Sequence, residues 1–305
     1  MIETINLGGN KFEQDLKQIG LTQIDKLSWV SGEFTFTKLD WRNLLELNKI
    51  EDLQDKAWKF GERNVVPSNI LAIIDETGGE LLLVQNKHNN DRTPLAFTLT
   101  LATDDPKKHF LHMVAVDPKV QSSDIGRKIM LLEGAIARSK GVETIEWTYD
   151  PLMGGNSNLY LGKLRAVPYT YTVNKYGIVK NSDTSGESRY KDVPTDRFTV
   201  KWNVGNEKVW GAASKSLAQN RDLLPDMWSG DGNAPDIFRF GIPYDFTTLS
   251  TGQMLEARQS LRKVCLKVMD HDDFSSRDFI IGTHKVIDFT PDPNKRTNTY
   301  TFVRK

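Results

Sequence analysis

Residues 110–149 form a strand–helix–strand pattern that constrains the fold more than any other feature of this 305-residue chain. Phe110–Val116 is almost continuously apolar and ends at Asp117-Pro118, which predicts a strand buried on both faces. A polar loop follows, and Gly126–Ser139 has the period of a helix. Glu143–Tyr149 then alternates as a second strand. Two strands joined by a helix are expected to be parallel neighbours in one sheet.

Periodicity predicts further elements on both sides of this unit. Strands are expected at Phe34–Leu39, Glu80–Gln85, Leu95–Ala102, Val167–Val173 and Arg197–Val204, and two short ones close the chain. Helices are expected at Trp41–Phe60, at Asn69–Asp75 with Ser68 as its cap, at Ser157–Leu164 and at Gly252–Met269. The predicted fold class is therefore α/β (α+β): a mixed, mainly antiparallel twisted sheet flanked by helices, with N- and C-terminal additions.

The chain is predicted to contain three parts. Residues 1–32 carry apolar side chains at helical spacing and are interpreted as an N-terminal helical appendage. Residues 33–205 hold the strands and helices of the predicted core. After Gly205 the sequence has few strong strand or helix signals, and no flexible linker rich in glycine and serine separates it from the core. We therefore expect residues 206–305 to be an extension packed on the core, which covers its aromatic side chains.

Composition excludes several classes of function. Lysine plus arginine total 40 and aspartate plus glutamate total 40, and this balance argues against a nucleic-acid binder. The only cysteine, Cys265, rules out an internal disulfide framework and an all-cysteine zinc site, and it fits a reducing cytoplasm. No apolar run approaches the ~20 residues that span a membrane. Met1–Asn10 shows no secretory signal, so a cytoplasmic location is predicted.

The loop between the two central strands carries the most informative motif. Backbone N–H groups at a helix start are unpaired and can hold a pyrophosphate. The segment His112–Lys128 resembles the acetyl-CoA-binding segment of the GNAT acyltransferase superfamily. The family loop runs Arg or Gln, two variable residues, Gly, one variable residue, then Gly or Ala. Gln121 and Gly126 match its two ends, and Asp124 stands where the first glycine belongs. A carboxylate at that position is expected to oppose the pyrophosphate.

Other segments resemble one uncharacterised GNAT-like family with a C-terminal extension. The matching residues are Trp147–Leu152, Asn156, Leu164–Ala166, Pro194–Arg197, Ile242–Phe246 and the helix around Arg258–Arg262. The family pattern includes Trp-Thr-Phe-Asp-Pro-Leu, an asparagine and Leu-Gly-Ala, and Arg165 replaces the glycine of the last.

The resemblance implies an acyl-CoA-dependent N-acyltransferase that acts on a small amine or an amino-acid-like metabolite. Acetyl-CoA or another acyl-CoA would be the cosubstrate, and no metal is expected. The residues implied in binding it are Val114, Val116, Gln121, Ser122, Ser123, Asp124, Ile125, Gly126, Arg127 and Asn156.

Three side chains are candidates for the proton transfers that acyl transfer to an amine requires. His112 suits a general base near neutral pH, and its alternative is a hydrogen-bonded core histidine. Tyr160 lies where the resemblance places a tyrosine that protonates the thiolate, and its alternative is aromatic packing. Glu146 would act as a base through water, or would lie on a solvated strand face. Asp196 and Arg197 are interpreted as a pair that braces a loop.

Two other functions remain open at this stage. The chain would be a non-catalytic GNAT-like module that binds a metabolite or a protein, or an acyltransferase that takes its acyl group from an acyl-carrier protein. A homodimer is also left open. His271-Asp272-Asp273 is interpreted as a solvated helix end and not as a metal site, because adjacent residues rarely converge on one ion.

Overall fold

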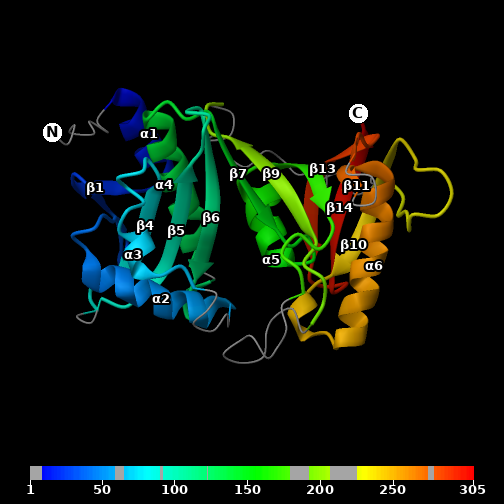
Figure 1. Ribbon diagram of the computed structural model, residues 1–305, viewed down its shortest axis with the longest axis horizontal. Helices are drawn as coiled ribbons and strands as arrows, with labels where there is room; N and C mark the ends of the chain where they lie inside the picture. Colours follow the sequence, from blue (N-terminus) through cyan, green and yellow to red (C-terminus); the bar gives the residue numbers. More distant parts are fainter. Residues whose placement is uncertain are drawn as a thin grey trace. The chain divides into compact units, whose positions relative to one another are not determined.

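The computed structural model describes residues 9–58, 65–89, 92–121, 123–178, 192–206, 225–273 and 278–305. The described chain divides into two compact units. The first contains residues up to Glu146 together with 203–206, and the second contains 147–178, 192–202 and 225–305. The division falls inside strand β7 (Thr144–Tyr149) (Figure 1). The predicted domain boundaries at residues 32 and 205 remain predictions.

The sheet of the first unit is mixed and mainly antiparallel, as predicted. Its strand order is β1 to β7 in sequence, and only β6 and β7 are parallel. The strands before β7 are β1 (Thr22–Asp25), β2 (Ser28–Ser31), β3 (Phe34–Lys38), β4 (Glu80–Asn86), β5 (Pro94–Ala102) and β6 (Lys108–Val116). The β1–β2 hairpin was not expected. Each of its strands has four residues, and β1 is exposed throughout, so neither gives a hydrophobic alternation.

Helices flank both faces of this sheet, as predicted. They are α1 (Asn10–Ile19), α2 (Leu44–Trp58), α3 (Ser68–Leu71) and α4 (Ile125–Ser139). Leu47, Ile50 and Leu53 of α2 belong to one buried cluster with Leu83 and Phe97 of the sheet. α3 is shorter than expected, and its N-cap is residue 67, one position before the predicted cap.

The opposite face of the sheet carries α1 and α4. Strand residues alternate between faces, so side chains of β4 and β5 that avoid the α2 cluster point to this side. The ring of Phe12 from α1 lies edge-on to Trp29 of β2, with centroids 6.2 Å apart. The predicted burial of β6 on both faces is wrong: burial alternates along it, and His112 is exposed. The side of β6 that carries His112 is only partly covered, and half-buried apolar residues such as Phe110 and Val114 are common on such a surface.

Buried carboxylates lie between α4 and the sheet. Glu133 of α4 is completely buried and accepts a hydrogen bond of 2.8 Å from Thr98 Oγ1. Glu80 of β4 is equally buried and forms ion pairs with Lys38, at 3.5 Å, and with Lys140. Burial, and next the charge of Glu80, raise the pKa of Glu133 to about 8, against hydrogen bonds from threonines and the Lys140 charge. Ionisation of Glu133 therefore opposes folding of this core.

Stability of the protein should consequently fall as pH rises towards 8. The folded pKa of Glu133 lies above its ordinary value of 4.5, so its contribution is fully present below about pH 4.5 and is lost as pH rises through about 8. The Glu133→Gln variant cannot ionise. Urea unfolding between about pH 5 and about pH 8.5 should show wild type losing up to ~1.4 kcal/mol per pH unit relative to the variant. The exposed Glu76→Gln is the matched control. Parallel pH profiles for wild type and Glu133→Gln would contradict this assignment.

The second unit contains two sheets. In one, the strand order is β7, β9 (Arg197–Asn203), β8 (Val167–Thr172), β11 (Asp270–Asp273) and β12 (Asp278–Ile280). The other is antiparallel, with the order β10 (Ile237–Pro243), β14 (Thr297–Arg304) and β13 (His284–Asp292). His271 lies in β11 and is buried, so the interpretation of this segment as a solvated helix end is wrong.

Four helical segments complete the described part of the second unit: α5 (Gly154–Ser157), the π-helical turn η3 (Asn158–Lys163), the 3₁₀ turn η8 (Phe246–Thr248) and α6 (Thr251–Val268). Ser250 and Gln253 form a reciprocal capping box at the start of α6, which runs beside β10 (Figure 1). Within the residues the structure describes, every helix is too short or too polar to span a bilayer.

The C-terminal segment shares its core with residues 147–202. Tyr300 of β14 packs edge-on against Phe198 of β9, with ring centroids 5.6 Å apart. The Tyr300 hydroxyl donates to the carbonyl of Pro151 at 2.6 Å and lies 2.7 Å from Ser157 Oγ. Strands β9 and β14 and the segment from Pro151 to Ser157 thus share one core.

Candidate functional site

The predicted pair of central strands is present in the first unit. β6 and β7 are parallel neighbours, and their ladder covers three pairs, from Lys108 with Thr144 to Phe110 with Glu146. From Leu111 to Val116 the ladder of β6 is with β5. The parallel register confirms the strand–helix–strand prediction.

The loop after β6 is held by its own hydrogen bonds. Asp117 caps the short 3₁₀ turn η2 (Pro118–Val120) by accepting from the Lys119 N–H at 2.9 Å. Gln121 Nε2 donates to the carbonyl of Val116 at 3.4 Å, and Ser123 Oγ donates to that of Val120 at 2.5 Å. Ser122, another predicted ligand, lies outside the described residues. Val114 and Val116 are half-buried.

The helix that follows begins without a side-chain cap. Asp124 is its N-cap residue, and the Asp124 side chain makes no capping hydrogen bond. The first helical hydrogen bond joins Lys128 N–H to the Asp124 carbonyl at 3.1 Å. The backbone N–H groups of Ile125, Gly126 and Arg127 precede that bond and carry the partial positive charge of the helix terminus. This end of α4 is therefore suited to an anionic group.

The Asp124 carboxylate is turned to Arg127. Arg127 Nε donates to both carboxylate oxygens, at 2.9 and 3.1 Å, and the guanidinium forms an ion pair with the same group. Opposite charges at this range offset each other, so Asp124 opposes a bound anion less than the sequence alone predicts. Both side chains are about one-third exposed, and the pair is reachable from solvent.

The two residues that replace family glycines, Asp124 and Arg165, both have a left-handed backbone conformation. Asp124 has φ of 61° and Arg165 has φ of 59°. Only six non-glycine residues of the described chain have positive φ. Glycine adopts this conformation at no steric cost, and other residues are strained in it. At both positions the side chain differs from the family pattern, and the backbone has a conformation that a glycine adopts without strain.

The predicted catalytic residues of the first unit are His112 and Glu146. The imidazole of His112 reaches solvent, although enough protein surrounds it for burial to lower its pKa. A depressed pKa keeps the ring neutral at pH 7, which is the form that a general base requires. Glu146 is half-buried at the end of the β6–β7 ladder, 3.5 Å from the ammonium of Lys108.

Tyr160 and Asn156 belong to the second unit. Tyr160 is buried and packs edge-on against Trp147 and Tyr149, with centroids 5.0 and 5.2 Å away. This is the aromatic packing that its alternative interpretation describes. Asn156 lies in α5 and is exposed.

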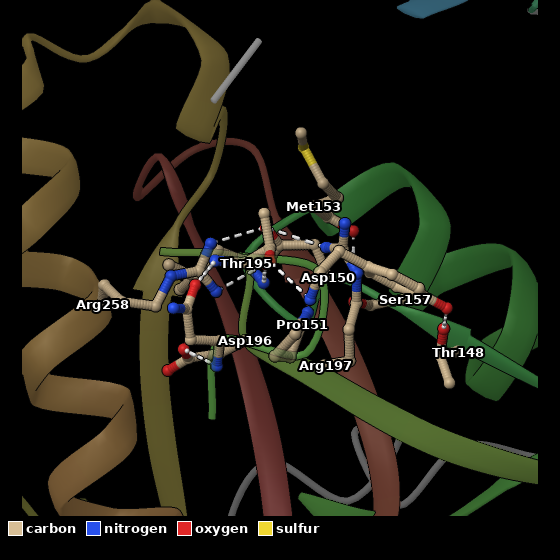
Figure 2. Close-up of polar contacts among 12 residues, drawn as sticks. Thr148, Asp150, Pro151, Met153, Ser157, Thr195, Asp196, Arg197 and Arg258 are labelled. Carbon is tan, nitrogen blue, oxygen red and sulfur yellow. Dashed lines mark hydrogen bonds and ion pairs between the residues drawn. The ribbon is translucent and has the colours of Figure 1, made fainter. Parts of the chain in front are cut away.

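A buried ionic network that the sequence reasoning did not identify lies in the second unit (Figure 2). Asp150, directly after β7, accepts two hydrogen bonds from the Arg258 guanidinium, at 2.8 and 2.5 Å. It also accepts from the Leu152 N–H at 2.9 Å, and Arg197 lies 3.4 Å away. Burial disfavours the charge on Arg258, yet the Asp150 carboxylate more than offsets this and raises the guanidinium pKa.

Asp196 forms the second half of this network. Arg262 donates to its two carboxylate oxygens at 2.7 and 3.0 Å, and the Tyr171 hydroxyl also donates to it. Burial favours the neutral carboxyl, but these donors outweigh it and lower the pKa of Asp196. The predicted pair of Asp196 with Arg197 is therefore wrong, since each residue bonds to a partner from another segment.

The network joins three segments that the sequence singled out as motifs. Asp150, the Asp196-Arg197 dipeptide and the Arg258–Arg262 stretch are separated in the chain and meet around two carboxylates. Asp150 and Arg258 have no more than 1% of their side chains exposed, so they are closed to a ligand. These motif residues therefore have a role in folding. The loop before α4 is the better candidate for binding a ligand. Among the described residues, no group of three or more potential ligands is placed to hold a metal ion.

Comparison with known proteins gives structural neighbours only. No family model matches the sequence, and no curated protein sequence matches it. The ribosomal-protein-S18-alanine N-acetyltransferase from Escherichia coli is 16% identical, with a TM-score of 0.43 over 60% of this chain and 98% of its own. A putative acetyltransferase from Salmonella typhimurium with its cofactor acetyl-CoA gives the same identity and TM-score over 60% and 99%. An acetyltransferase of the GNAT family from Streptococcus pneumoniae is 11% identical, with a TM-score of 0.44 over 56% and 99%.

The Asp150→Asn variant should destabilise the protein strongly. It removes one charge of a buried pair and leaves the Arg258 guanidinium without compensation, which costs about 3–5 kcal/mol. Urea unfolding at neutral pH measures the loss. The matched control is Asp231→Asn, which removes an exposed partner of Lys263 and should change stability little. Equal effects of the two substitutions would show that the network does not stabilise the second unit.

Proposed function

We propose that this protein is an acyl-CoA-dependent N-acyltransferase of the GNAT type. In this proposal the cosubstrate lies along the second half of β6, and its pyrophosphate binds the loop from Gln121 to Arg127. The acceptor is a small amine or an amino-acid-like metabolite. A lone, buried Cys265 suits the reducing cytoplasm in which acyl-CoA is used.

The left-handed backbone at Asp124 is the observation that carries this proposal. The loop matches the family pattern at Gln121 and Gly126, and its one mismatch keeps the φ of a glycine. Arg165, which replaces the other family glycine, also has a positive φ. Coincidence at one position would be weak support. Agreement at two positions, far apart in sequence and chosen from sequence alone, supports the alignment with the family.

The loop has the donors that a pyrophosphate needs. The N–H groups of Ile125, Gly126 and Arg127 lie at the uncapped start of a 15-residue helix. Each can donate to a phosphate oxygen, and the helix dipole adds a favourable field. The Arg127 guanidinium would exchange part of its contact with Asp124 for the phosphate, since charge-assisted hydrogen bonds to phosphate are strong.

His112 is the proposed general base. Acyl transfer requires a neutral amine, which attacks the thioester carbonyl and expels the thiolate. A neutral, solvent-reachable imidazole on β6 can take the proton that the amine loses. Glu146 is the second proposed base and acts through water.

Removal of the Asp124 carboxylate should tighten CoA binding. The Asp124→Gly variant keeps the left-handed backbone, removes a like charge and frees Arg127, which together favour binding by about 1–3 kcal/mol. Titration calorimetry with CoA measures the change. Asp124→Asn separates charge from size, and Asp104→Asn, an exposed carboxylate elsewhere in the first unit, is the control. Weaker binding by Asp124→Gly would mean that the Asp124–Arg127 pair itself holds the ligand.

Loss of the His112 imidazole should lower turnover without unfolding the protein. We expect His112→Gln to reduce kcat by about 100-fold, because it removes the base and leaves binding in place. The melting temperature should hardly change, since the side chain is exposed. The wild-type rate should fall only below pH 6.5, because the pKa of His112 is lowered from that value. His88→Gln, an exposed loop substitution, is the control. Full turnover with an early melting transition would make His112 a structural residue.

A further inference from the structure

A polar pocket of about 640 Å³ lies in the first unit, on the α2 face of the sheet. Sites that hold small organic ligands have volumes of this size. It does not include β6, the loop before α4 or any predicted catalytic residue. Its floor is formed by Thr35 and Thr37 of β3 and by Ser28 of β2.

The pocket exists because α2 covers only part of its sheet face. The apolar residues of α2 that pack on the sheet start at Leu47. Asn43 and Glu46, which precede it, form one wall of the pocket instead. The chain from Gln85 to Arg92, which joins β4 to β5, supplies another wall through its described residues, and Asp25 of β1 lies at the edge.

Charges of opposite sign line different walls of this pocket. The acidic groups are Asp25 on β1 and Glu46 on α2, and the basic groups are Lys87 and Arg92 after β4. Glu46 and Arg92 form an ion pair of 3.3 Å, and the Arg92 side chain is 72% exposed. Among the described residues, Lys87 and Asp25 have no ion-pair partner. Among its described residues, the pocket therefore offers one unpaired cation, Lys87, and one unpaired anion, Asp25.

We propose that this pocket binds a short peptide with free ends. The peptide carboxylate binds Lys87 and Arg92, and the peptide ammonium binds Asp25 and Glu46. Glu46 and Arg92 already compensate each other, so a ligand with a single charge would leave either Lys87 or Asp25 unpaired, whereas a zwitterion compensates both. The volume exceeds what one free amino acid fills and suits two or three residues.

The uncharged lining suits peptide groups. The hydroxyls of Thr35 and Thr37 have no side-chain hydrogen bond within the described chain, so they are available to a ligand. Asn89 provides a carboxamide on the opposite wall. Hydroxyls and carboxamides both donate and accept, which matches the N–H and C=O of a peptide bond. This ligand class is independent of the acyl-transfer proposal, because no residue of the pocket belongs to the proposed acyl-CoA site.

The first test is titration calorimetry of the full-length protein with triglycine. N-acetyl-triglycine lacks the ammonium, and triglycine amide lacks the carboxylate. Each should bind at least about tenfold more weakly than triglycine, because each leaves one of the two unpaired pocket charges, Asp25 or Lys87, without its partner. No heat with millimolar triglycine, or equal affinities for all three compounds, would overturn the proposal.

The second test assigns each end of the peptide to its wall. Lys87→Gln should weaken triglycine binding by about tenfold and leave the already weak binding of triglycine amide unchanged. Asp25→Asn should show the same selectivity with N-acetyl-triglycine as its insensitive ligand. Lys17→Gln and Glu13→Gln, exposed on α1, are the matched controls for charge. If pocket variants bind triglycine as tightly as these controls, the site is not this pocket. Far-UV circular dichroism checks that each variant is folded.

Discussion

The buried pair of Asp150 and Arg258 is the interaction on which the second unit depends. Two charges with almost no exposure remain in the core because each compensates the other, and because Leu152 and Arg197 add further contacts to the same carboxylate. The pair joins the residue after β7 to a helix more than one hundred residues later. Tyr300 and Phe198 form a common core around it. The C-terminal segment is therefore part of the fold of residues 147–202 and not an independent addition to it.

In the first unit, helix α4 also combines burial of an ionisable group with an electrostatic role. Glu133 of this helix lies in the core, where burial raises the pKa of its carboxyl to about 8 and favours the neutral form. The N-terminus of the helix has no side-chain cap. The buried side of the helix thus packs on the sheet, and its N-terminus presents free N–H groups to an anion. Asp124 and Arg127 offset each other beside those groups. This charge balance supports the proposal that the loop binds a phosphate group although it carries a carboxylate.

Long periodic segments could be predicted from the sequence, and contacts between distant segments could not. The β6–α4–β7 order follows from apolar runs and a polar loop, so it was predicted correctly. β1 and β2 have only four residues each, and β1 is exposed throughout, so neither produces a pattern. Asp196 and Arg197 are adjacent in sequence, but their partners, Arg262 and Asp150, are fixed only by tertiary folding. The polar pocket draws on five elements, β1, β2, β3, α2 and β4, and on the chain after β4, and no local pattern in the sequence brings them together.

The most direct test of the acyltransferase account is the stability of the wild-type protein in the presence of CoA, acetyl-CoA and longer acyl-CoAs. A ligand that binds only the folded protein stabilises it by about 2.7 kcal/mol at 100 times its dissociation constant. Thermal melting at increasing concentrations should show a rise in melting temperature for at least one of these compounds, and adenosine alone should have no effect. A melting temperature that does not change with any acyl-CoA at millimolar concentration would contradict the central claim.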